Sequence, residues 1–165
     1  MASDAIKFSV RTDPNLEAFA FATGRFANKV EDWRPLLEAF GELFKGNEQR
    51  QFASEGGNSG GWAPLTEAYD AWKQAHFPGP IGVLHGFLRS AMTGGDGYTQ
   101  IVGKTEASYG LGGGPATVSG KYFDGGNTRG MPARKVIAFD SGERRRWQKL
   151  VHLWLVDLAF ENGWK

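Results

Sequence analysis

The tripeptide Gly103-Lys104-Thr105 has the residue types that close a phosphate-binding loop, in which backbone N–H groups and a lysine hold nucleotide phosphates. That loop also needs a glycine at the position of Tyr98, whereas Gly97 comes one residue too early. The flanking residues favour a strand, a turn and a second strand over the strand, loop and helix that phosphate binding requires. We therefore expect a simple turn here and keep a nucleotide-binding enzyme that uses Lys104 and Thr105 as a rival hypothesis.

The other residue types that carry chemistry do not form a recognisable site. His76, His85 and His152 lack the spacing of metal ligands, and no G-x-S-x-G nucleophile motif occurs. The chain has no cysteine, which excludes disulfides and thiolate metal sites. The glycines of residues 110–115 are not followed by a helix that could hold a pyrophosphate. We predict a protein that is not an enzyme and has no catalytic residues, cofactor or metal.

A basic cluster precedes the C-terminal end of the sequence. It consists of Arg144, Arg145, Arg146 and Lys149, and Arg145 and Lys149 are four residues apart on one helical face. Cations near a helix start are slightly unfavourable with the helix dipole, so an acidic group could compensate them. The alternatives are a solvated face, acidic residues of another subunit, and a small DNA-binding module. The first two are favoured over DNA.

The last predicted helix, capped by Ser141, has the clearest periodicity in the chain. Its main apolar stripe consists of Trp147, Leu150, Val151, Trp154, Leu155 and Leu158. On the far side lies a second stripe of Leu153, Val156 and Phe160. Either the helix is sandwiched within its own monomer, or a neighbouring subunit covers the second stripe together with Arg145 and Lys149.

Periodicity elsewhere predicts an α+β fold in one domain, with helices packed on a small, mainly antiparallel sheet. Strands are expected at residues 6–12, 98–102, 107–111 and 134–139. Helices are expected from Leu16, from a segment that Asp32 caps, at residues 66–75 and in the later part of 81–92. The predicted core contains Phe26, Val30, Leu37, Phe40, Leu88, Ile137, Trp147, Leu150, Trp154 and Leu158.

Two glycine-rich segments, residues 46–61 and 112–130, are expected to be mobile loops. Trp62 and Pro64 should anchor the end of the first loop, because a tryptophan buries a large apolar area. Pro132 and Arg134 should end the second loop at a strand start, where proline loses no ladder hydrogen bond. Deleting residues 56–61 is then expected to leave the melting temperature little changed.

Composition limits the partners. The net charge of +1 gives no overall field toward nucleic acid or lipid. The first seven residues lack the apolar run of a signal peptide, and no stretch is long enough to span a membrane. A reducing cytoplasm suits a chain without cysteine.

A family resemblance rests on a set of segments in a fixed order, namely residues 32–44, 52–56, 61–66, 72–73, 84–90, 122–126 and 131–134. Together they resemble the phage virion morphogenesis, or tail completion, family of Mu-like and P2-like phages. The similarity covers roughly residues 30–160, with His85 where the family usually has threonine.

The resemblance implies an α+β structural virion protein that is assembled in the host bacterial cytoplasm. It implies a homo-oligomeric ring in the neck, by analogy of 6 or 12 copies, which completes the tail and joins it to the head. Its partners would be a connector or adaptor and the tail terminator or tail tube, with DNA passing through the channel without sequence-specific binding. A tail terminator, or an assembly factor absent from the mature virion, are the alternatives within this class.

Overall fold

The computed structural model describes residues 16–115, 123 and 132–164. These residues form five α-helices, one 3-10 turn and a two-stranded antiparallel sheet, so the predicted α+β class is confirmed. In chain order the elements are α1 (Leu16–Val30), α2 (Arg34–Ala53), η1 (Gly57–Ser59), α3 (Glu67–His76), α4 (Phe87–Met92), β1 (Tyr98–Val102), β2 (Ala107–Leu111) and α6 (Ser141–Glu161).

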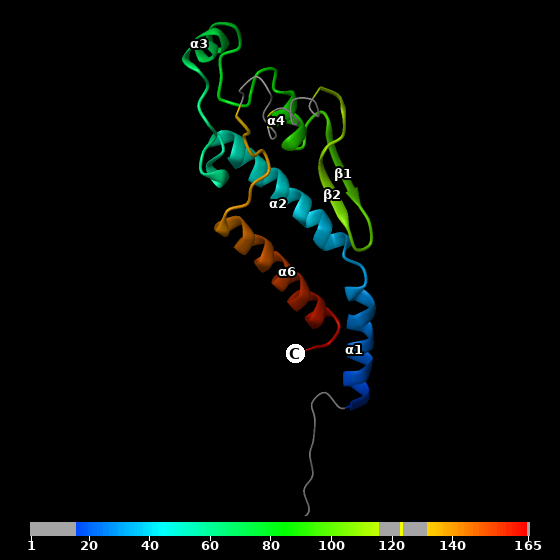
Figure 1. The fold of residues 1–165 in the computed structure, drawn as a ribbon. Helices are drawn as coiled ribbons and strands as arrows, with labels where there is room; N and C mark the ends of the chain where they lie inside the picture. The colour runs from blue at the N-terminus through cyan, green and yellow to red at the C-terminus, as the bar shows by residue number, and fades with distance from the viewer. Residues whose placement is uncertain (1–15, 116–122, 124–131, 165) are drawn as a thin grey trace, which may run out of the picture.

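Helix α2 is the central element. Pro35 lies in its first turn, where the missing N–H costs nothing, and Asp32 accepts the Arg34 backbone N–H at 3.2 Å. The N-cap residue itself is Trp33, one position after the Asp32 predicted for that role. Helix α6 lies along one side of α2, and the hairpin with α4 lies along the other (Figure 1).

Aromatic pairs hold α2 and α6 together in antiparallel orientation. Phe40 stacks on Trp147 with ring centroids 4.9 Å apart, and Trp33 lies 5.9 Å from Trp154. The predicted main stripe of the last helix is therefore the face that packs on α2.

The hairpin packs on α2 and α4. Strands β1 and β2 pair in the register Tyr98↔Leu111 to Val102↔Ala107. On the inner face the Tyr109 hydroxyl donates to the Leu37 carbonyl oxygen. A close approach occurs at Gly41, where an added Cβ would lie 2.7 Å from Gln100 Oε1.

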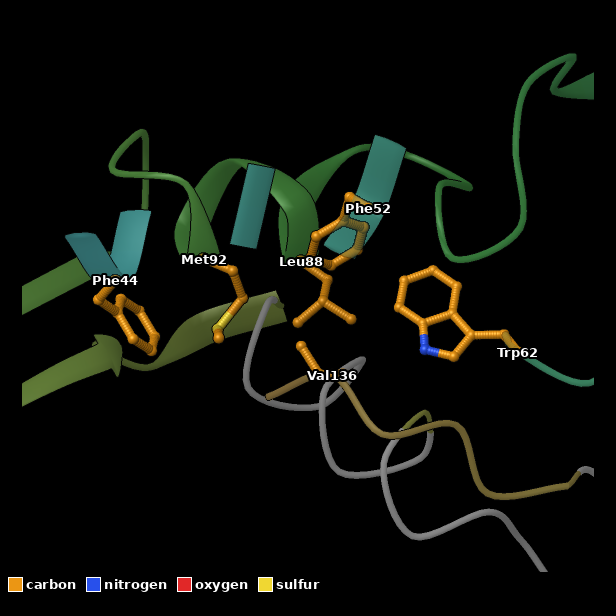
Figure 2. Close-up of a cluster of buried hydrophobic side chains, with 6 residues drawn as sticks. All are labelled: Phe44, Phe52, Trp62, Leu88, Met92 and Val136. Atoms are coloured by element: carbon orange, nitrogen blue, oxygen red, sulfur yellow. The ribbon is translucent and has the colours of Figure 1, made fainter. Parts of the chain in front are cut away.

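The best-buried cluster lies between α2, α4 and residues 134–139 (Figure 2). Phe52 meets Trp62 edge to face at 5.3 Å. Each fully buried apolar side chain of this size contributes about 1.5–3 kcal/mol. The members are Phe44, Phe52, Trp62, Leu88, Met92 and Val136.

The predicted core is partly confirmed. Leu88 and Leu158 are buried. Seven others are half-buried: Phe26, Val30, Leu37, Phe40, Trp147, Leu150 and Trp154. The prediction that Ile137 belongs to the core was wrong, because Ile137 is 49% exposed, whereas its neighbour Val136 is 4% exposed.

The loop predicted at residues 46–61 was wrong in its first half, because α2 continues to Ala53. The polar residues Asn47, Glu48 and Gln51 are fully buried on this helix. Residues 54–61 turn back tightly: Gly61 donates its backbone N–H to Gly56 at 2.9 Å, and Trp62 to Glu55 at 2.7 Å. This segment is part of the packed structure, which removes the basis for expecting that deletion of residues 56–61 leaves the melting temperature little changed.

The strand predicted at residues 134–139 was also wrong, since the backbone bends at residues 136–137 and pairs with no strand among the described residues. Side chains take the place of a ladder, because the Lys135 and Ala138 carbonyls accept hydrogen bonds from the Gln51 and Asn47 amides.

Two further predictions concern single positions and terminal segments. Ser141 is the first residue of α6, and the cap is Asp140, whose carboxylate accepts the Glu143 backbone N–H at 2.7 Å. The strand predicted at residues 6–12 lies outside the described residues, as does the loop at 112–130 apart from residues 112–115 and 123.

Candidate interaction surfaces

One face of α6 points away from α2. This outer face of α6 consists of Arg145, Lys149, Leu153, Val156 and Phe160, whose spacing places them on one side of the helix, opposite the main stripe. Leu153 is 46% and Phe160 61% exposed, and Val156 is half-buried. The part of the chain that the structure describes leaves this apolar row open to solvent.

The basic cluster is divided by its local partners. Glu143, which is buried, accepts hydrogen bonds at 2.6 Å from Arg146 and from Arg50 of α2. Arg144 donates to the Phe139 carbonyl oxygen at 3.3 Å. Arg145 and Lys149 are exposed and form no ion pair among the described residues. Acidic residues of the same chain therefore compensate part of the cluster.

The capping residue of α6, Asp140, also contributes to the charge at the start of this helix. The Glu143 backbone N–H holds the pKa of Asp140 below its usual value, and Arg146 and Arg145 act in the same direction more weakly. A carboxylate at this position interacts favourably with the helix dipole and offsets the unfavourable arginines.

A set of buried amide and indole groups fixes residues 134–139 against α2. This polar clamp consists of Asn47, Gln51, Asn58 and Trp62. Trp62 Nε1 and Gln51 Nε2 both donate to the Lys135 carbonyl, at 2.8 and 2.9 Å. Asn47 Nδ2 donates to the Ala138 carbonyl at 3.0 Å, and its Oδ1 accepts from Asn58 at 2.9 Å.

The predicted loop anchors have unequal environments. Trp62 is buried, and Arg134 is buried with its guanidinium donating to the Ala63 and Pro64 carbonyls at 2.8 and 3.2 Å. Pro64 and Pro132 are exposed. Arg134 and Trp62 thus tie the two predicted anchor segments to each other and to α2.

Glu48 is a buried carboxyl group on the core side of α2. Asn47 donates to its Oε1 at 2.9 Å, while its Oε2 has no hydrogen-bond partner among the described residues. Burial raises the pKa of Glu48 to about 8, and the Asn47 hydrogen bond lowers it by less. The side chain is therefore protonated at neutral pH.

Exposed rings line α3 and the segment that follows it. This aromatic row consists of Tyr69, Trp72, His76, Phe77, His85 and Phe87. Neighbouring ring centroids lie between 4.8 and 5.8 Å apart. Tyr69 and Trp72 are 43% exposed and Phe87 is 50% exposed. Figure 1 places α3 at the opposite end of the molecule from α1.

A cavity of about 190 Å³ opens beside this row, and we call it the α3 cavity. Tyr69, Lys73, Phe87, Phe123 and Arg134 are among its lining residues, together with residues 82–86. Its walls are mostly apolar, yet two of its side chains are cations.

The residues first considered for chemistry lie apart. Lys104 is in the turn between β1 and β2, where its ammonium lies 3.5 Å from Glu31 and its carbonyl accepts the Trp33 N–H at 2.8 Å. The strand-turn-strand prediction is confirmed, and no helix follows to hold phosphates. The three histidines are exposed, and no group of metal-binding side chains forms within the described ranges. No helix described here combines the length and apolar character needed to cross a membrane.

Sequence reasoning missed the polar clamp, Glu48 and the α3 cavity. The four-residue spacing of Phe44, Glu48 and Phe52 was an available sign that α2 continues. No sequence pattern predicts the burial of Lys73, because this burial depends on residues 77–79 folding back over α3.

Comparison with protein families, curated proteins and solved structures finds nothing that matches this chain.

Proposed function

We propose that this chain is a non-enzymatic structural protein of a tailed phage virion, and that it forms a ring in the neck that completes the tail. The ordered resemblance of residues 30–160 to the tail completion family supports the proposal. The observation that carries it is the outer face of α6, which exposes Leu153 and Phe160 on a helix already packed on its other side. Ring subunits need such a surface for repeated contacts with neighbours.

The charges on this face suit a protein partner. Arg145 and Lys149 flank the apolar row without intrachain ion pairs among the described residues, so an acidic rim on the next subunit would complement them. An apolar centre with charges at its edge is the usual composition of a protein interface.

Purified virions provide the test. Quantitative mass spectrometry should find the protein at about 6 or 12 copies per particle, the numbers taken from the analogy with closed rings. Cryo-electron microscopy of the neck should place α6 between adjacent subunits. Absence of the protein from mature virions would reject the structural role and favour the assembly factor, whereas a ring at the tail end would favour the tail terminator.

A DNA-binding module is the second candidate, because Arg145 and Lys149 are exposed and unpaired among the described residues. Fluorescence anisotropy with a DNA duplex at increasing salt tests it. Binding that weakens linearly with log salt and is lost in Arg145→Ala/Lys149→Ala would support it. No binding at physiological ionic strength would reject it.

A further inference from the structure

The α3 cavity contains two cationic side chains that are almost fully removed from solvent. Lys73 and Arg134 are each 3% exposed, and both line the same space. They come from α3 and from the segment at 134–139, so the fold brings them together from distant parts of the sequence.

The hydrogen-bond partners of both cations are neutral. Lys73 Nζ donates to the carbonyls of Phe77, at 3.4 Å, and Gly79, while Arg134 donates to those of Ala63 and Pro64. None of the ion pairs between described residues includes Lys73 or Arg134. Their donors are thus satisfied in part, but their charges are not neutralised by the described chain.

Two uncompensated positive charges in an apolar cavity are unfavourable. Removing a charge from water costs several kcal/mol unless a counter-charge and hydrogen bonds replace the lost hydration. Burial correspondingly lowers the pKa of Arg134. A carboxylate that entered the cavity would be attracted by both cations at once, in surroundings that screen the attraction weakly.

The aromatic row extends beyond the wall of the α3 cavity. Tyr69 and Phe87 belong to both the cavity wall and the aromatic row, which continues through Trp72, His76 and Phe77. A ligand that only filled about 190 Å³ would leave most of the row exposed. Exposed aromatic rings around a charged pocket are typical of the energetic centre of a protein interface.

We propose that the α3 cavity and the aromatic row bind a segment of a partner protein, with an aspartate or glutamate side chain entering the cavity and apolar side chains covering the row. The acidic side chain pairs with Lys73 and Arg134. The proposal does not depend on the function in a phage neck, because it rests on the cavity and its charges alone.

Random peptides displayed on yeast are the probe, selected for binding to the full-length protein. Enriched peptides should share an acidic residue next to aromatic or aliphatic ones. Replacing that acidic residue by its amide, Glu→Gln or Asp→Asn in the peptide, should weaken binding roughly tenfold or more, because the buried cations then lose their counter-charge. This arm leaves the protein itself unchanged.

Protein variants supply the second arm. Lys73→Met keeps the length of the side chain and should cause a similar loss, and Trp72→Ala, at an exposed ring, should weaken the same peptides. Lys29→Met, at an exposed position of α1 at the other end of the molecule (Figure 1), is the matched control and should bind as the wild type does. Asp124→Asn, which removes the carboxylate next to Phe123 in sequence, should also leave binding unchanged.

The opposing outcomes are distinct. Lys73 and Arg134 could serve only to hold the backbone of residues 63–64 and 77–79. Lys73→Met would then lower the melting temperature while the preference for acidic peptides was absent. Selection of no peptides, selection of peptides without an acidic residue, or equal binding of the amide peptide would each overturn the proposal. Stronger binding to Asp124→Asn would do so too, since it would show that the chain neutralises its own cavity.

Discussion

Glu48 makes the stability of this protein depend on pH in an unusual direction. The carboxyl lies on the core face of α2 between Phe44 and Phe52, each four residues away. Its pKa rises from 4.5 to about 8 on folding because burial disfavours the charged form. Between these two pH values the folded protein holds a proton that the unfolded chain releases, so stability falls as pH rises through this window. Below pH 4.5 the contribution of Glu48 is constant.

Glu48→Gln should remove this dependence, because an amide has no proton to release. Wild type should lose stability on the order of 1 kcal/mol per pH unit within the window, and the variant clearly less. Urea unfolding at several pH values between 4.5 and 8 measures both slopes. Glu38→Gln, at an exposed position of the same helix, is the control and should follow the wild type. Parallel curves for Glu48→Gln and wild type would contradict the burial of a neutral carboxyl.

Substitutions at Gly56 and Gly60 would distinguish the cost of backbone strain from the cost of steric overlap. Both have positive φ, at 90° and 88°, where a side chain costs about 1–2 kcal/mol. An added Cβ at Gly56 would lie 2.3 Å from Trp62 Cδ1, whereas at Gly60 it would meet nothing within 4 Å.

We therefore expect Gly60→Ala to destabilise by roughly the conformational cost alone, about 1 kcal/mol, and Gly56→Ala by at least about 1 kcal/mol more. Thermal unfolding compares the two variants directly. Equal losses would mean that the turn at residues 54–61 can move away from Trp62, as a loose loop would.

At the scale of elements, sequence patterns correctly predicted the helices and the hairpin whose formation depends on residues close together in the chain. The hairpin at 98–111, the helix from Leu16 and the long last helix all follow from periodicity, and the structure confirms them. Predictions failed where the deciding partner is distant in sequence. Asn47 and Gln51 suggested a loop by their polarity, yet they form hydrogen bonds to carbonyls about ninety residues later. Burial of a polar helix face is favourable only when such partners exist.

The strand predicted at residues 134–139 also failed because a distant partner decides its conformation, since no strand pairs with this segment among the described residues. The predicted core included Ile137, but Arg134 and Val136 are the side chains that are buried here. Without a neighbouring strand no ladder fixes the register; the polar clamp fixes it. The α3 cavity could not be predicted at all, since its two cations come from segments whose contact only the complete fold creates.

Gln51→Leu tests whether the polar clamp holds this segment. The substitution keeps approximate size but removes bonds to the Lys135 carbonyl, the Ser59 hydroxyl and the Asn58 backbone N–H. Buried groups left unsatisfied should cost about 1–3 kcal/mol in the free energy of unfolding. Gln49→Leu, at an exposed site of the same helix, should change the free energy of unfolding by less than about 0.5 kcal/mol. A neutral Gln51→Leu would show that apolar packing alone seats residues 134–139.

The whole molecule has α2 in the middle, with α6 on one side and the hairpin with α4 on the other (Figure 1). This arrangement covers α2 well but leaves α6 as an outer layer with one bare face. The aromatic row lies near α3, at the end of the molecule away from α1, so the two candidate surfaces are separate. A subunit with two distinct apolar surfaces can contact its own copies through one and a different protein through the other.

Leu153→Glu/Phe160→Glu should separate assembly from folding. Both side chains are largely exposed, so the variant should unfold within a few degrees of wild type. Native mass spectrometry should nevertheless show loss of the proposed ring, because charges would replace the apolar centre of the proposed contact. Trp154→Glu, on the face packed against Trp33, is the contrasting variant and should destabilise the monomer. An unchanged oligomer in the double variant would remove the outer face of α6 from the interface.

The polar clamp has a consequence for how this chain can evolve. The donors that hold residues 134–139 are side chains, at Asn47, Gln51 and Trp62, but the acceptors in that segment are main-chain carbonyls, which every amino acid carries. Mutation at Lys135 or Ala138 leaves those acceptors in place, whereas mutation of a donor removes the bond. Descendants of this gene should therefore drift freely at 135 and 138 while purifying selection holds 47, 51 and 62 constant.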